Sequence, residues 1–325
     1  MTNEDLPVTI ADVLAARRRI APHLRPTPTH RYPSLDRELG LEVWVKHENH
    51  QPVGAFKVRG GVNLIARLPA EQRAAGVIAA STGNHGQSVA FAARLFGVRA
   101  IVAVPEGANP TKVQAMRDFG AEVVFRGKSY DDARLWVEEE AARRGYRYIH
   151  SGNEPDLIAG VGTLTLEMLE AQPELDVLFV PVGGGSGAAG ASIVAKALRP
   201  GMRVIGVQAE GAPAAYLSWK RGRPVEAPAS TFAEGLATGV PFELPQRIMR
   251  ALLDDFVLVS DADIKAAVRL YLEHTHNLAE GAGAAALAAA RAHADELRGQ
   301  RVGVVLSGGN LSPEQLREVL ECAAP

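Results

Sequence analysis

Cysteine is almost absent from this chain of 325 residues, since Cys322 is the only one. An internal disulfide framework is therefore excluded, and its place near the C-terminus makes Cys322 a bystander rather than a nucleophile. No apolar run is long enough to span a bilayer, and residues 1–5 do not have the character of a signal peptide. These absences predict a cytoplasmic protein with no membrane partner.

The chain also has no large excess of positive or negative charge, because its formal net charge is only −2. Such a balance gives no electrostatic reason to expect a nucleic-acid partner. The chain has no CxxC or HExxH metal pattern and no GxSxG nucleophile elbow of the hydrolases. His274, His276 and Glu280 have spacings of two and four, which do not make a closed ligand set. We therefore predict no metal site.

Short β-rich apolar segments alternate with alanine-rich helical stretches through nearly the whole chain. This alternation predicts an α/β protein of two lobes, each an open, mostly parallel, twisted sheet flanked by helices. We expect a large cofactor-binding domain from residues 1–50 and 148–325, and a small domain from residues 51–147. The expected strands are 41–45, 76–80, 99–104, 122–125, 177–182, 203–208, 256–259 and 301–306. The expected helices include 58–67, 85–96, 110–119, 130–144, 157–170, 188–198, 261–274, 283–294 and 313–320.

The residues around Lys57 are not typical of a lysine on the protein surface. It lies between Phe56 and Val58, directly after a Gly-Ala pair. Desolvation in such an apolar setting lowers the pKa of a lysine, and the free amine that results is what a Schiff base needs.

Glycine-rich loops follow two of the expected strands. Residues 183–187 read Gly-Gly-Gly-Ser-Gly and lie between a strand and a helix. Free main-chain amides and the helix dipole favour a phosphate at such a place, and Ser186 adds a hydroxyl donor. A tight turn that needs glycine is the simpler explanation, but several glycines in a row favour phosphate. Together with Lys57 and the loop at 307–310, this pattern indicates pyridoxal phosphate (PLP).

A competing interpretation comes from the same loop. Gly183, Gly185 and Ala188 fit the dinucleotide pattern G-x-G-x-x-A, and Glu210 follows the next strand. This pattern leaves Lys57 and residues 81–85 unexplained. A nicotinamide-dependent oxidoreductase is therefore the alternative from another class.

Two further loops carry polar side chains at the ends of expected strands. Ser81 or Thr82 can simply cap the helix that follows, but several amide donors at a helix start can also hold an α-carboxylate. Asn84 can donate to a phenolate oxygen of the cofactor. Ser307 is either a turn residue or a hydroxyl that bonds a pyridine nitrogen without protonating it.

Taken together, these motifs resemble the fold type II PLP-dependent enzymes, and among them the threonine/serine dehydratase and serine racemase branch. The resemblance covers nearly the whole chain, from about residue 10 to the last expected helix. The matching segments are residues 47–61, 81–98, 104–113, 154–169, 180–190, 231–239, 279–289 and 306–310.

The resemblance implies a role for each candidate residue. Lys57 is the implied Schiff-base lysine, and Lys57 and Thr82 are the implied catalytic side chains. The residues implied to bind the cofactor are Lys57, Phe56, Asn84, Gly183, Gly184, Gly185, Ser186, Gly187, Glu280 and Ser307. The residues implied to frame the substrate carboxylate are Ser81, Thr82, Gly83 and His85.

The implied activity is an ammonia-lyase that dehydrates L-threonine, L-serine or a related β-hydroxy amino acid to a 2-oxo acid plus ammonia. The implied assembly is a homodimer. Serine racemase and a β-replacement synthase with a thiol co-substrate are the alternatives within the family. Thr82 departs from the racemases, which carry a serine there, because it keeps the hydroxyl but adds a methyl group. Tyr216 stands where the racemase metal site has an aspartate, beside Glu210 and Ala214. Residues 150–153 vary with substrate in the family, so specificity does not follow from the resemblance.

Overall fold

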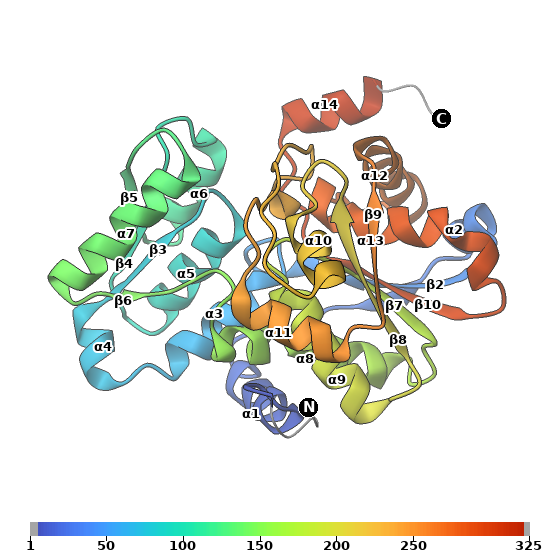
Figure 1. Cartoon of the computed structure of the whole chain (residues 1–325), viewed down its shortest axis with the longest axis horizontal. Helices are drawn as coiled ribbons and strands as arrows, with labels where there is room; N and C mark the ends of the chain where they lie inside the picture. The colour runs from blue at the N-terminus through green and yellow to red at the C-terminus, as the bar shows by residue number, and fades with distance from the viewer. Residues whose placement is uncertain (1–5, 322–325) are drawn as a thin grey trace.

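The structure is a computed structural model of the chain, and it describes residues 6–321. Cys322 lies outside the described residues. Two lobes lie side by side, each built on its own sheet (Figure 1). This arrangement confirms the predicted α/β fold with mostly parallel sheets flanked by helices.

The small lobe has a sheet of four parallel strands, in the order β5-β4-β3-β6. Its apolar strands are covered by helices on both faces, as parallel sheets require. The strands are β3 (Val77–Ala80), β4 (Ala100–Val104), β5 (Glu122–Phe125) and β6 (Arg147–Tyr148). The helices of this part of the chain are α3 (Lys57–Ala66), α4 (Ala70–Ala75), α5 (Asn84–Leu95), α6 (Pro110–Asp118) and α7 (Tyr130–Arg144).

The large lobe has a sheet of six strands, in the order β1-β2-β10-β7-β8-β9, and only β1 runs antiparallel to its neighbour. Its strands are β1 (Thr29–Arg31), β2 (Glu42–His47), β7 (Val177–Pro181), β8 (Arg203–Ala209), β9 (Asp255–Val259) and β10 (Arg301–Leu306). Its helices are α1 (Ile10–Ile20), α2 (Pro33–Leu39), α8 (Pro155–Ala171), α9 (Ser186–Leu198), α10 (Ala214–Arg221), α11 (Glu243–Leu252), α12 (Asp261–Thr275), α13 (Gly281–Ala292) and α14 (Pro313–Glu321). Short 3₁₀ turns are η2 (Glu48–His50), η3 (Glu234–Leu236) and η4 (Ala294–Leu297).

Side chains alternate across the large sheet and so make two cores. Val302 and Val304 of β10 face the core with α12 and α13, and Val305 faces the core with α8 and α9. Helix α13 is almost wholly small residues and is buried along its length. It therefore packs close to the sheet.

Helix α3 lies where the two lobes meet, because it packs against α5 on one side and α8 on the other. The domain boundaries at 50/51 and 147/148 remain a prediction. Among the described residues, no helix is both long and apolar enough to cross a membrane.

Candidate active site

A cavity of about 880 Å³ lies between the two lobes. It is lined by the carboxyl ends of β3, β7 and β10 and by the first turns of α5 and α9. The structure brings every predicted site residue to this cavity: Phe56, Lys57, Ser81, Thr82, Gly83, Asn84, His85, Gly183, Gly184, Gly185, Ser186, Gly187, Glu280 and Ser307.

Lys57 is the first residue of α3. Its amine donates hydrogen bonds to the Ser151 carbonyl oxygen and to Ser186 Oγ, each at 3.0 Å. Burial lowers the pKa of Lys57 to about 8. A much larger fraction of this amine is therefore unprotonated near neutral pH than in an ordinary lysine.

The loop at 183–187 joins β7 to α9. Gly185 is the N-cap of α9 and has a φ of +91°, which favours glycine. A Cβ atom on Gly184 would lie 2.2 Å from the Phe242 ring, so packing also requires glycine here. Within residues 6–321, no group accepts a hydrogen bond from the main-chain amides of 183–188. The turn and the packing therefore both require glycine in this loop, and its unpaired amides at a helix N-terminus are available for a phosphate. Phosphate binding by residues 183–187 stays a prediction.

The loop between β3 and α5 is organised by Ser81. Its hydroxyl accepts hydrogen bonds from the Gly83 amide at 3.2 Å and the Gly86 amide at 2.9 Å. His85 is buried with Nε2 3.0 Å from the Ile149 carbonyl oxygen. Burial, and then the nearby Lys57 charge, lowers the pKa of His85 to about 3. The His85 ring is therefore neutral at physiological pH and donates through Nε2.

Asn84 links the two lobes across the cavity. Its amide nitrogen donates to Glu280 Oε1 at 2.7 Å, and its amide oxygen accepts from Asn310 Nδ2 at 2.7 Å. Burial raises the pKa of Glu280. Ser307 lies at the end of β10 and is only 5% exposed. Asn84, Asn310 and Ser307 therefore place uncharged donors and acceptors on this side of the cavity.

Other cavity residues were not predicted. Ser151 belongs to the 150–153 loop and Asn310 to the 307–310 loop, but the sequence predicts no role for either side chain. The remaining lining side chains have no local signal in the sequence, because only the fold brings them together. They are Tyr130, Asp131, Arg134 and Phe242 among others. His150 and Asn153 also line the cavity and belong to the same 150–153 loop as Ser151, whereas Lys112 and Glu234 lie in segments that carry the resemblance. Among the described residues, no group of three or more His, Cys, Asp or Glu side chains is placed to hold a metal ion.

The chain is similar to proteins of known family. The model of a family described as "Pyridoxal-phosphate dependent enzyme" matches residues 20–308. The L-threonine ammonia-lyase of Geobacter sulfurreducens is 39% identical over 318 residues, which are 97% of this chain and 78% of that protein.

Solved structures are similar too. The processed form of threonine deaminase isoform 2 from Solanum lycopersicum matches with a TM-score of 0.93 and 31% identity, over 97% of this chain and 92% of that chain. Maize serine racemase matches with a TM-score of 0.90 and 32% identity, over 96% and 97%. The family match includes every predicted site residue.

Proposed function

The chain belongs to the family of pyridoxal-phosphate-dependent enzymes, and from this membership we infer that it is an ammonia-lyase that dehydrates L-threonine and L-serine to a 2-oxo acid and ammonia. Within that family, the structural observation that carries the inference is Lys57, a partly buried amine with a lowered pKa beside a loop of free amides. The nicotinamide-dependent alternative is set aside, because the matched family uses PLP.

The cofactor would be held by residues of both lobes. The amides of 183–187 and the Ser186 hydroxyl would bind its phosphate, Ser307 would meet its ring nitrogen, and Asn84 its 3′ oxygen. When bound, PLP supplies an aldehyde that condenses with amines and a ring that withdraws electrons from the α-carbon of an amino acid.

Lys57 would then act as the general base. Its lowered pKa lets the amine take the α-proton of the substrate at neutral pH. The Ser151 carbonyl and Ser186 hydroxyl hold this amine at the cavity wall, which orients it. The carbon–oxygen bond to the β-hydroxyl would then break, and the hydroxyl would leave as water with one proton, which balances the α-proton taken by Lys57. The released enamine would tautomerise to an imine, and a second water would hydrolyse the imine to the 2-oxo acid and ammonia.

The substrate carboxylate would lie at the N-terminus of α5. Ser81, Thr82, Gly83 and His85 line the cavity there, and the positive end of the helix dipole favours an anion. Because His85 stays neutral, it orients the loop without adding charge. Thr82 is exposed and lines the cavity, and its hydroxyl has no hydrogen-bond partner within residues 6–321. By the family resemblance, it is the candidate acid on the face opposite Lys57.

The test is the absorbance spectrum of the purified protein, before and after L-threonine is added, with 2-oxobutanoate and ammonia measured in parallel. We expect a visible band that shifts, equal yields of both products, and no turnover by Lys57→Ala. A shift without 2-oxo acid would instead favour serine racemase, detected as D-serine, or a β-replacement synthase, detected on adding a thiol. No band after incubation with PLP would refute the assignment.

Three further predictions concern the assembly, the location in the cell and the domain boundaries. We propose a homodimer in the cytoplasm, with residues 1–50 and 148–325 as the large domain and residues 51–147 as the small domain. Size-exclusion chromatography with light scattering tests the dimer. Limited proteolysis tests the boundaries, with cleavage expected near them.

A further inference from the structure

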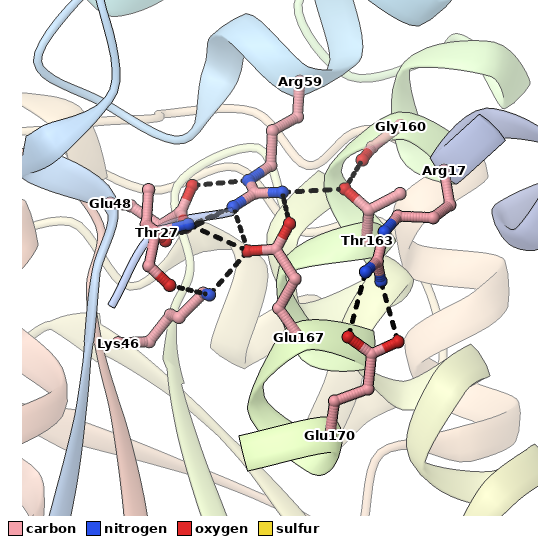
Figure 2. A network of polar contacts seen from close by, with 9 residues as sticks. All are labelled: Arg17, Thr27, Lys46, Glu48, Arg59, Gly160, Thr163, Glu167 and Glu170. Atoms are coloured by element: carbon pink, nitrogen blue, oxygen red, sulfur yellow. Dashed lines mark hydrogen bonds and ion pairs between the residues drawn. The ribbon is translucent and has the colours of Figure 1, made fainter. Parts of the chain in front are cut away.

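Four charged side chains are buried together outside the cavity, where the end of β2, the start of α3 and the middle of α8 meet (Figure 2). They form a buried charge cluster that consists of Lys46, Glu48, Arg59 and Glu167, joined by Thr27 and Thr163. None of the four charged residues is more than 6% exposed. Two cations face two carboxylates, so the cluster as a whole is neutral.

Arg59 is the centre of this cluster. Its guanidinium donates to both oxygens of Glu48, at 2.7 and 2.8 Å, and to both oxygens of Glu167, at 2.7 Å each. Figure 2 shows it between the two carboxylates, and Thr163 Oγ1 lies 3.1 Å from Nη1. Bidentate pairs of this kind fix the orientation of an arginine as well as its position.

Lys46 completes the balance of charge. Its amine donates to Glu167 Oε2 at 2.6 Å and to the Thr27 carbonyl oxygen at 2.8 Å. Burial alone would raise the pKa of Glu167, but Arg59 and Lys46 outweigh burial and the net shift is downward. Glu167 is therefore ionised and holds two cations at once.

Stability alone does not explain such a cluster. Buried ion pairs can often be replaced by apolar side chains without loss of stability, whereas they do specify one arrangement of the elements that carry them. Here the elements are β2 with η2, α3 and α8. The cluster therefore fixes how α3 sits on α8.

Lys57 lies on the same turn of α3, two residues before Arg59. Its acceptor, the Ser151 carbonyl, precedes α8 by a few residues, and Glu167 lies on α8 itself. The two helices also touch closely, because a Cβ atom on Gly160 would lie 2.5 Å from the Arg59 carbonyl oxygen. Phe56, the N-cap of α3, makes no side-chain capping bond. The first turn is held by the Phe56 amide, which donates to the Ser307 carbonyl at 2.9 Å, by the Ser88 hydroxyl, which donates to the Lys57 carbonyl at 2.7 Å, and by the side chain of Arg59.

We propose that Arg59, held by Glu48 and Glu167, is a positioning residue that sets the place of the Lys57 amine beside Ser151 and Ser186. The proposal deepens the proposed function and rests on it, because that function makes Lys57 the reacting amine. Loosening the cluster would let the first turn of α3 move and would displace that amine.

The first test compares two variants of α8. Glu167→Gln removes a carboxylate from the cluster, and Glu170→Gln makes the same change at the exposed Arg17 pair drawn beside it. For Glu167→Gln we expect kcat with L-threonine to fall roughly 10- to 100-fold, with KM changed less than about threefold. Glu170→Gln should match the unaltered protein.

The second test uses the cofactor-free protein. Lysines are dimethylated with ¹³C-formaldehyde, the Lys57 signal is assigned with Lys57→Ala, and its pKa is measured by NMR. Displacement towards water should raise the pKa of Lys57 by roughly one unit in Glu167→Gln. Loss of a nearby negative charge, without movement, would instead lower it. The two explanations therefore predict opposite signs.

A charge-balanced variant separates positioning from folding. Lys46→Met with Glu167→Gln removes one cation with one anion, so we expect thermal unfolding to recover. If the cluster serves stability alone, kcat recovers as well, and this result overturns the proposal. We expect kcat to stay low and the Lys57 pKa to stay raised, because Arg59 still lacks its second carboxylate.

Different results would refute the positioning role of Arg59 and the proposed dehydratase activity. A folded Glu167→Gln protein with unchanged kcat and unchanged Lys57 pKa would refute positioning while the dehydratase stands. No turnover of L-threonine by the unaltered protein would refute the function, and the NMR comparison would still test positioning. If Glu167→Gln does not fold, the charge-balanced variant carries both measurements.

Discussion

Lys57 shows how much of the chemistry depends on where one amine lies. The side chain is held by Ser151 and Ser186, and burial lowers its pKa to about 8. A neutral amine attacks an aldehyde and an ammonium does not, so the rate of reaction follows the unprotonated fraction.

From this we predict the pH dependence of cofactor attachment. The rate at which PLP attaches to the cofactor-free protein should rise with pH and level off above about 8, whereas an ordinary lysine would keep rising towards 10.5. Stopped-flow absorbance measures this rate, and Lys57→Ala provides the baseline without attachment. A rate that still rises steeply between pH 9 and 10 would contradict the lowered pKa.

At the same scale, the sequence predicts residues whose type is unusual for their surroundings. Lys57 among apolar neighbours and glycines after a strand are signals of this kind, and the structure brings all of them to one cavity. The sequence around Arg59 gives no such signal, because the proposed role of Arg59 depends on its contact with Glu167, which lies 108 positions away in the chain. Partners that distant are set by the packing of helices and are not visible in local pattern.

At the scale of elements, the prediction succeeded for every strand of four or more residues. All eight expected strands occur, and 122–125 and 301–306 have the predicted bounds. Strands β1 and β6 were not predicted, because three and two residues are too few to show a period. Helices α1, α2, α4, α10 and α11 were also absent from the expected set, although α1 has a full capping box that begins at Thr9.

The turn before α9 allows a prediction for one glycine. In Gly185→Ala, the methyl group would meet Met249 Cε at 2.8 Å, and the residue would keep a φ of +91°. We expect stability to fall by about 1–3 kcal/mol from backbone strain, and the affinity for PLP to fall at least about tenfold as the amides move. Urea unfolding and fluorescence titration with PLP measure the two effects.

Gly201→Ala is the matched control, because a Cβ atom there would have nothing within 4 Å and its φ is not in the left-handed range. This variant should change neither stability nor PLP affinity by a measurable amount. If Gly185→Ala binds PLP as tightly as the unaltered protein, the loop does not hold the phosphate.

At the scale of the whole molecule, an ion pair between two residues of the cavity wall joins the two lobes. Lys112 on α6 of the small lobe pairs with Glu234 on η3 of the large lobe, and both line the cavity. Glu234 is 55% exposed, so the pair contributes little to stability. Its position nevertheless couples the two lobes at the wall of the cavity.

For Glu234→Gln we predict a change in turnover without a change in fold. The melting temperature should move by less than about 2 °C, while kcat/KM for L-threonine should fall about threefold at low salt. At about 0.5 M salt the two proteins should converge, because exposed pairs are screened. Glu122→Gln breaks an exposed pair with Arg99 inside the small lobe and should leave kcat/KM unchanged at any salt. If kcat/KM fell equally in both variants, the loss in Glu234→Gln would not arise from the broken contact between the lobes.

The stability of the whole molecule in acid depends on buried histidines, because a histidine that is neutral in the folded chain takes up a proton when the chain unfolds. His47 at the end of β2 is fully buried, and burial, followed by the nearby His50 and His30, lowers its pKa to about 3. Its Nε2 lies 2.8 Å from Tyr32 Oη, and its Nδ1 has no partner among the described residues.

The sign of the effect follows from proton binding. Between pH 6.5 and 3 the unfolded chain binds a proton at His47 that the folded chain does not, so stability is lost as pH falls through this window. From pH 6.5 to 5 the loss is about 2 kcal/mol for this residue. The substitution His47→Phe should therefore reduce the difference between the unfolding free energies at pH 7 and pH 5 by about that amount, measured by urea unfolding of cofactor-free protein.

The control is His23→Gln, a substitution of an exposed histidine, which should leave this difference unchanged. If His47→Phe keeps the full difference, the acid sensitivity arises elsewhere, and His85 in the cavity is the next residue to replace, since burial lowers its pKa to about 3 as well.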